Sequence, residues 1–205
     1  MPAFGEHRAN AMSVFGEQRP RRRRLFVAAD LDDTARAACA NVAERLRAKG
    51  WLGKWVPPEN YHLTVAFLGS VDADRVGNVI TAVAAVAPRI SSVDVPLDTV
   101  GAFASERKPR VAWVGPSATV PAFGAMCGVV RGALAAAGFE LDARADPHVT
   151  LARSDGRSPL PVVEPPLIPP LRIEALTLYE SFTERTGPRY EAVERFLLAP
   201  GIERA

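Results

Sequence analysis

Residues 61–69 read YHLTVAFLG, and this stretch is partly repeated as PHVTLAR at residues 147–153. Both stretches are rich in apolar and β-branched residues, a composition typical of buried strands. Both contain the pattern His-x-Thr-x, in which each x is apolar. The pattern is carried by His62 and Thr64 in the first stretch and by His148 and Thr150 in the second. This internal repeat suggests two similar lobes in one fold.

Side chains alternate between the two faces of a strand, so the histidine and the threonine of each stretch are expected on the same face. The opposite face of the first stretch carries Leu63 and Val65. By the same alternation we interpret Tyr61 and Phe67 as core residues rather than as rings that stack on a base. Each strand then has one apolar face for a core and one polar face for a cleft or solvent.

The sequence on either side of the two stretches predicts an α+β fold with mainly antiparallel strand pairing. Further strands are predicted at residues 24–29, 92–103, 110–114, 171–181 and 190–198, the last two flanking a turn at 186–188. Helices are predicted after a cap at Asp32 or Asp33 as far as Lys49, and at residues 72–87 and 119–138. Six prolines between residues 154 and 170 indicate an extended connection.

The composition is that of a globular chain of about one domain. The chain has 205 residues, of which 48% are hydrophobic and 23% are charged, enough to bury a sizeable core. No run reaches the roughly 18 apolar residues that a membrane span needs. Cys39 and Cys127 lie far apart and match no redox or metal-ligand spacing. We therefore expect a cytoplasmic protein away from the membrane, a monomer without an obligate protein partner.

The net charge of +2 is unevenly distributed. Residues 1–24 hold six basic residues against two acidic ones, so the remainder of the chain carries −2. A broad basic surface for duplex nucleic acid is therefore not indicated for the folded part. We interpret residues 1–23 as a flexible basic tail and residues 24–200 as a single domain. Any nucleic-acid substrate is expected in a local cleft of that domain.

The histidines of the two motifs have the properties of an acid/base pair. With an ordinary pKa of about 6.5, His62 and His148 can hold either protonation state near neutral pH. Phosphodiester cleavage needs both states, because one group deprotonates the attacking water and the other protonates the leaving alkoxide. Thr64 and Thr150 are expected to donate hydrogen bonds to phosphate oxygens. The residues by themselves do not say which histidine is the acid.

Other candidate site residues carry weaker signals. Arg110, at the start of a predicted strand, and Arg153, just after the second motif, are candidates for phosphate contacts. No cluster with metal-ligand spacing accompanies the histidines, so we expect neither a metal nor another cofactor, although Asp146 near His148 keeps a metal site open. A single His-x-Thr on a strand is usually an ordinary hydrogen-bonded pair. The second copy is what favours catalysis.

The paired motifs, 86 positions apart, resemble the two signature motifs of the 2H phosphoesterases. More narrowly, the chain is similar to the bacterial RNA 2′,3′-cyclic phosphodiesterases, also described as 2′-5′ RNA ligases. Further support comes from RLFVA at 24–28, PRVAWVG at 109–115, LYES at 178–181 and GPRY at 187–190. The similarity spans about residues 24–198.

The resemblance implies a bilobal fold, with helices outside and two small antiparallel sheets that face each other across a cleft with pseudo-twofold symmetry. It implies metal-independent hydrolysis of a 2′,3′-cyclic phosphate at an RNA end to a 2′-phosphomonoester, and in some members 2′,5′ ligation of RNA ends. Carried over by motif, His62 is the proton donor and His148 the proton acceptor, while Thr64 and Thr150 bind the phosphate.

Two other functions fit the same motifs. The first is the same chemistry on a small cyclic nucleotide or on an ADP-ribose cyclic phosphate. The second is a module that binds nucleotides or RNA ends without turnover. Intact histidines and threonines in both motifs argue against the second function, because binding alone needs no matched acid and base.

Overall fold

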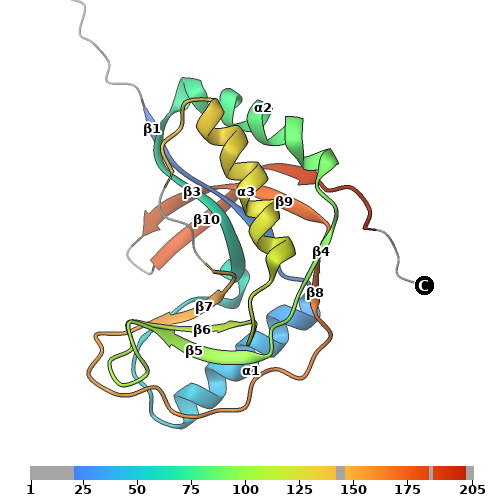
Figure 1. Ribbon diagram of the computed structural model, residues 1–205. Helices are drawn as coiled ribbons and strands as arrows, with labels where there is room; N and C mark the ends of the chain where they lie inside the picture. Colours follow the sequence, from blue (N-terminus) through green and yellow to red (C-terminus); the bar gives the residue numbers. More distant parts are fainter. Residues whose placement is uncertain (1–20, 142–145, 185–186, 202–205) are drawn as a thin grey trace, which may run out of the picture.

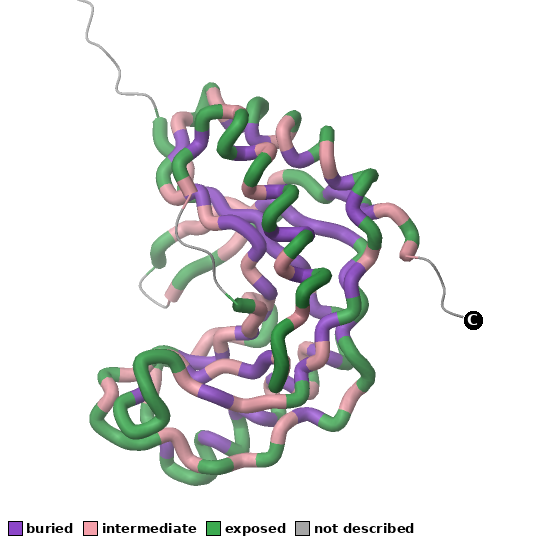
Figure 2. Tube along the Cα trace, viewed as in Figure 1, coloured by how far each residue is buried: buried purple, intermediate pink, exposed green. Residues whose placement is uncertain are grey.

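The computed structural model of the chain describes residues 21–141, 146–184 and 187–201 (Figure 1). Thr186, in the predicted turn, lies outside these residues. The described part has the predicted α+β fold, with three α-helices and mainly antiparallel sheets. The strands carry most of the buried residues, whereas each helix is buried along one side (Figure 2). No helix in this part is long and apolar enough to cross a membrane.

Eight strands form one antiparallel sheet in the order β10-β9-β1-β3-β7-β6-β5, with β2 paired to β7. The strands are β1 (Arg22–Asp30), β2 (Lys54–Trp55), β3 (His62–Asp72), β5 (Thr99–Phe103), β6 (Val111–Gly115), β7 (Val149–Arg153), β9 (Ala175–Glu184) and β10 (Gly187–Leu197). The motif strands β3 and β7 are neighbours that pair through Leu63 and Val149. This one pair divides the sheet into a first half, β10-β9-β1-β3, and a second half, β7-β6-β5 with β2.

One helix covers the second half of the sheet and two cover the first half (Figure 1). α1 (Asp33–Ala48) begins after Asp32, whose carboxylate accepts the Ala35 N–H at 2.7 Å, and it packs against β7. α2 (Val76–Val86) and α3 (Pro121–Ala136) pack on each other, and α3 contacts β3. In each helix the buried residues recur at spacings of three and four, which directs one stripe toward the sheet.

Two of the predicted strands are each divided between two sheets. The predicted strand 92–103 consists of β4 (Val93–Val95) and β5, and the predicted strand 171–181 consists of β8 (Leu171–Ile173) and β9. β4 and β8 pair with each other in a separate two-stranded sheet. Pro96 follows β4 directly, and a proline cannot donate a hydrogen bond to continue the ladder.

The first strand begins two residues before the predicted domain boundary. Arg22 and Arg23 lie within β1, where they pair with Asp72 at 2.9 Å and with Glu180 at 2.6 Å. Both arginines therefore belong to the fold rather than to a tail. The rest of the predicted tail, residues 1–20, lies outside the described residues.

Candidate active site

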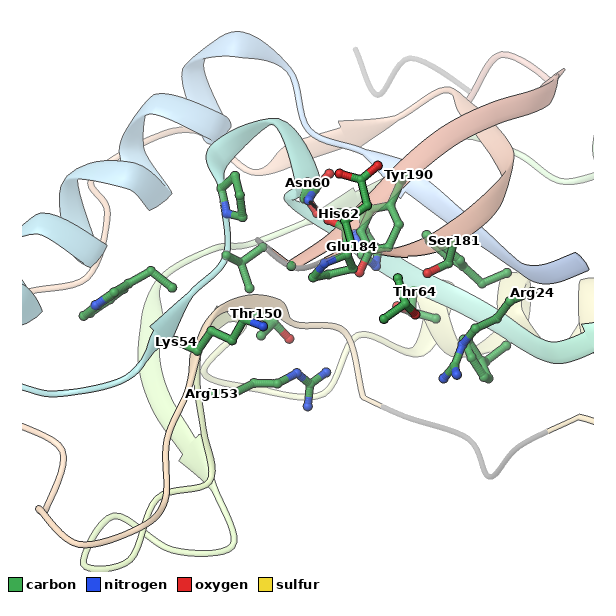
Figure 3. Close-up of a pocket in the computed structure, with 18 of the residues that line it drawn as sticks. Arg24, Lys54, Asn60, His62, Thr64, Thr150, Arg153, Ser181, Glu184 and Tyr190 are labelled. Atoms are coloured by element: carbon green, nitrogen blue, oxygen red, sulfur yellow. Dashed lines mark hydrogen bonds between the residues drawn. The ribbon is translucent and has the colours of Figure 1, made fainter.

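The polar faces of the two motif strands open into one cavity of about 560 Å³ (Figure 3). Five of the six predicted site residues line it: His62, Thr64, His148, Thr150 and Arg153. Side chains from β1, β9, β10 and the segment 54–60 complete its wall. The structure thus places both histidines, which are far apart in the sequence, on a single cavity between the two halves of the sheet.

Both histidines are held by the backbone in the same way. Nδ1 of His62 lies 2.7 Å from the carbonyl oxygen of Asn60, and Nδ1 of His148 lies 2.8 Å from that of Asp146. Because a carbonyl oxygen only accepts hydrogen bonds, Nδ1–H is the donor in each pair. With Nδ1 so engaged, Nε2 of each ring is the nitrogen left to exchange a proton with a substrate.

Aromatic rings surround both imidazoles. The centroid of the His62 ring lies 4.9 Å from that of Phe26 and 5.4 Å from that of Tyr190. The His148 ring meets Phe103 edge to face at 4.6 Å. Burial lowers the pKa of both imidazoles below the ordinary value of 6.5, because apolar surroundings disfavour the charged form. Each ring is therefore biased toward its neutral form.

The charged groups near the two imidazoles differ. Beyond the effects of burial and the backbone hydrogen bond, the Asp30 carboxylate raises the pKa of His62. The Arg153 guanidinium instead lowers the pKa of His148, an effect that Asp146 partly offsets. His148 also lowers the pKa of His62, by more than Asp30 raises it. The fixed charges near the two rings therefore differ in sign: a carboxylate acts on His62 and, most strongly, a guanidinium acts on His148.

Hydrogen bonds from β9 fix the carboxylate of Asp30. Asp30 pairs with His62 across β1 and β3. Its two oxygens accept hydrogen bonds from Thr177 Oγ1 at 2.8 Å and from the Tyr179 hydroxyl at 2.5 Å. Burial and then the contact with Asp30 raise the pKa of Tyr179, so its hydroxyl remains a donor. The negative charge therefore keeps a constant position relative to His62.

A β-bulge follows the threonine in each motif strand. Val65 in β3 and Leu151 in β7 have no partner in the register of the neighbouring strand, which shifts the alternation of side chains by one residue. Phe67 and Arg153 consequently line the cavity together with the threonines. The prediction that Phe67 lies in the core is wrong for this reason, whereas Tyr61 is buried as predicted.

Arg110 is the predicted site residue that lies outside the lining of this cavity. It is exposed and immediately precedes β6. Its backbone N–H donates to the Phe103 carbonyl at 2.9 Å, and its own carbonyl accepts from the Ser154 N–H at 3.0 Å. These bonds hold Arg110 at the connection between β5 and β6. We therefore expect no contact between Arg110 and a phosphate held by the two histidines.

The cavity lining also includes residues that sequence analysis did not single out, among them Arg24, Lys54 and Tyr190. A signal was available for Arg24, because strand alternation places it on the same face of β1 as Phe26, which also lines the cavity. Lys54 reaches the cavity because β2 pairs with β7, and Tyr190 because β10 pairs with β9. The pairing of β2 with β7 has no local signature in the sequence, whereas the turn predicted at residues 186–188 indicates the pairing of β9 with β10.

The lowered pKa values predict an acidic optimum for a reaction that uses this pair. The base must be deprotonated, so kcat/KM falls as the pH drops below the pKa of the base. The acid must be protonated, so kcat/KM falls as the pH rises above the pKa of the acid. Since both pKa values lie below 6.5, we expect the maximum of kcat/KM below pH 6.5. Rates measured from about pH 4.5 to 8.5 test this, and a plateau that continues past pH 8 would contradict it.

Known proteins resemble most of the chain. The family model described as LigT-like phosphoesterase matches residues 27–113. The RNA 2′,3′-cyclic phosphodiesterase of Thermotoga maritima is 26% identical over 187 residues, which cover 88% of this chain and 98% of that protein. The Thermus thermophilus protein of that name is 31% identical over 188 residues, with 85% and 90% covered. The crystal structure of E. coli LigT complexed with 3′-AMP has a TM-score of 0.70 at 30% identity, with 87% of this chain and 99% of that chain covered.

Proposed function

The chain belongs to the family of LigT-like phosphoesterases, and from this premise we propose that it hydrolyses the 2′,3′-cyclic phosphate at an RNA end to a 2′-phosphomonoester. The observation that carries the proposal is the convergence of two His-x-Thr motifs, one from each half of the sheet, on one cavity. Both imidazoles keep Nε2 available for proton transfer. An acid and a base beside one phosphorus atom are what displacement at a phosphodiester requires.

In the proposed reaction, Nε2 of His148 accepts a proton from a water molecule whose oxygen attacks phosphorus. The bond between phosphorus and O3′ breaks as the new bond forms, and Nε2–H of His62 protonates O3′. The product carries its phosphate on O2′. His148 then loses its added proton to solvent and His62 regains one, which restores the starting state.

The surroundings of the two imidazoles support this division of roles. Burial acts on both rings, and the fixed charges near them differ in sign. Arg153 lowers the pKa of His148, which favours the neutral ring that a base needs. Asp30 raises the pKa of His62, which favours the protonated ring that an acid needs. The signs of these two effects agree with the roles that the resemblance of the motifs implies.

The two halves of the sheet would act as two lobes related by an approximate twofold axis. Two repeated details support this arrangement: each histidine donates to the carbonyl two residues before it, and each threonine is followed by a bulge. In this arrangement Thr64 and Thr150 each donate a hydroxyl hydrogen bond to a phosphate oxygen. The residue two positions after each bulge differs, because Phe67 in the first half corresponds to Arg153 in the second. Only the second half therefore adds a cation at this position.

The direct test is incubation with an oligonucleotide that ends in a 2′,3′-cyclic phosphate, followed by identification of the product. We expect a 2′-phosphate and full activity in excess EDTA, because the proposed acid and base are both side chains. Within the described residues no group of three or more His, Cys, Asp and Glu side chains is arranged to hold a metal ion. A 3′-phosphate product would contradict the proposed direction of cleavage, and loss of activity in EDTA would favour a metal mechanism.

The same assay separates the alternative functions. A mononucleoside 2′,3′-cyclic phosphate or an ADP-ribose cyclic phosphate that is hydrolysed faster than the oligonucleotide would identify a small-molecule enzyme. Saturable binding without product over a long incubation would identify a binding module. Ligation would use the same acid and base, with a 5′-hydroxyl oxygen in place of water, so an added 5′-hydroxyl oligonucleotide tests for a 2′,5′-linked product.

A further inference from the structure

Three cations line the cavity without a carboxylate partner. Arg24, Lys54 and Arg153 belong to the lining, and none of them takes part in an ion pair with another described residue. By contrast, Arg22 and Arg23, on the same strand as Arg24, are paired with carboxylates. Unpaired cations on a cavity wall indicate an anionic ligand. A single cyclic phosphodiester carries one negative charge, so three cations point to more than one phosphate.

Along β1, the backbone of Arg24 lies well away from the position that faces His62. It pairs with Ser70 in the register of β1 and β3, whereas Asp30, six residues further along β1, pairs with His62. At about 3.3 Å per residue the two positions are on the order of 20 Å apart along the strand. Figure 3 shows Arg24 at the opposite end of the cavity from Lys54. A phosphate held at that end of the cavity is distinct from one held between the two histidines.

A row of aromatic rings connects Arg24 to the proposed acid. The guanidinium carbon of Arg24 lies 5.0 Å from the centroid of the Phe67 ring. Phe67 stacks on Phe26 at 6.5 Å, and Phe26 lies 4.9 Å from the His62 ring. A guanidinium that rests on a ring is already ordered, and its N–H groups remain free at the edge for phosphate oxygens. Ser181 of β9 also lines the cavity at this end (Figure 3).

We propose that Arg24 binds the phosphate that precedes the cyclic end of an RNA strand, so that the cavity distinguishes oligonucleotide ends from cyclic mononucleotides. A terminal cyclic phosphate has no nucleotide on its 3′ side, so any further phosphate in the cavity belongs to the neighbour on the 5′ side. The inference rests on the proposed function, because a second phosphate is present only in a polymeric substrate.

The test compares two substrates, a trinucleotide with a 2′,3′-cyclic end and a mononucleoside 2′,3′-cyclic phosphate. The measured quantity is the specificity ratio, kcat/KM for the trinucleotide divided by kcat/KM for the mononucleotide. Arg24→Ala is expected to lower this ratio about tenfold, the effect of one lost charged hydrogen-bonded contact. For the trinucleotide, the slope of log kcat/KM against log salt concentration should become shallower by roughly 0.7, the value for one phosphate contact on a single strand.

Arg22→Ala is the matched control. Arg22 is the same residue type on the same strand, but it pairs with Asp72 and lies outside the cavity lining, so we expect its ratio to change less than about twofold. Arg24→Lys keeps the charge without the planar fork and should give an intermediate ratio. Equal midpoints of thermal unfolding for the variants would show that a changed ratio reports binding rather than damage to β1.

The outcomes separate this inference from the proposed function. An unchanged ratio in the Arg24→Ala protein, or equal losses on both substrates, would overturn the role of Arg24 and leave the hydrolysis intact. An unchanged salt slope on the trinucleotide would overturn it as well. Failure of the unmodified protein to hydrolyse either substrate would instead reject the proposed function.

Discussion

Replacing His148 by alanine is expected to lower kcat on a cyclic-ended oligonucleotide by about 10²- to 10⁴-fold, the usual effect of removing a general base. Without its Nε2, no positioned group accepts the proton of the attacking water. The acid side of the pH profile should disappear as well, because that side reports protonation of the base. Single-turnover rates over the pH range measure both effects.

Replacing His62 by alanine is expected to cause a loss of similar size, about 10²- to 10⁴-fold, and to remove the alkaline side of the profile. The reason is that O3′ then leaves without a proton donor. His7→Ala, which changes the remaining histidine of the chain, is the control and should keep the rate. Near-normal rates in both site variants would reject the acid/base pair. If the His148 variant instead lost the alkaline side and the His62 variant the acid side, the acid/base pair would stand, with His148 as the acid and His62 as the base.

Replacing both threonines of the motifs by valine is expected to lower kcat by roughly 10²- to 10³-fold, as the loss of preorganised donors to a developing negative charge does. Thr64 and Thr150 are half-buried on strands, and valine keeps their branched shape, so the fold should remain. The hydroxyl donors to the phosphate oxygens are what the substitution removes. Steady-state kinetics with the double variant measure the effect.

The control for the threonine pair is Thr99→Val. Thr99 is also a half-buried strand residue, but it lies on β5 outside the cavity lining. We expect its kcat to stay within about twofold of the unmodified protein, as for most substitutions away from a site. The single variants Thr64→Val and Thr150→Val should lose less than the double variant. A double variant with the activity of the Thr99→Val protein would contradict phosphate binding by the threonines.

Elements with a strong local pattern could be predicted from the sequence. α1 has a capping Asp32, apolar residues at spacings of three and four, and a glycine just after its last turn, Gly50, so its start and end follow from the sequence. The division of residues 92–103 between two sheets could not be predicted in this way. An apolar run shows that a strand is buried, but it does not show which other strand will pair with it.

The candidate site also combines features that follow from the local sequence with features that depend on contacts between distant segments. The histidines and threonines share a face because alternation along a strand is a local rule. Phe67 and Arg153 break that rule, because the bulges arise where β3 pairs with β1 and β7 pairs with β6. The placement of Arg110 outside the cavity likewise depends on its bonds to other segments, to Phe103 and Ser154.

Residue types and local periodicity are enough to predict two strands, each with an imidazole and a hydroxyl on one face, and hence the kind of acid/base chemistry available. Which side chains meet depends on the folded chain. The two motif strands touch through Leu63 and Val149, and the cavity is completed by cations from β1 and β2. These contacts form between segments that are distant in the chain, so they depend on the packing of the whole fold, which no local pattern encodes.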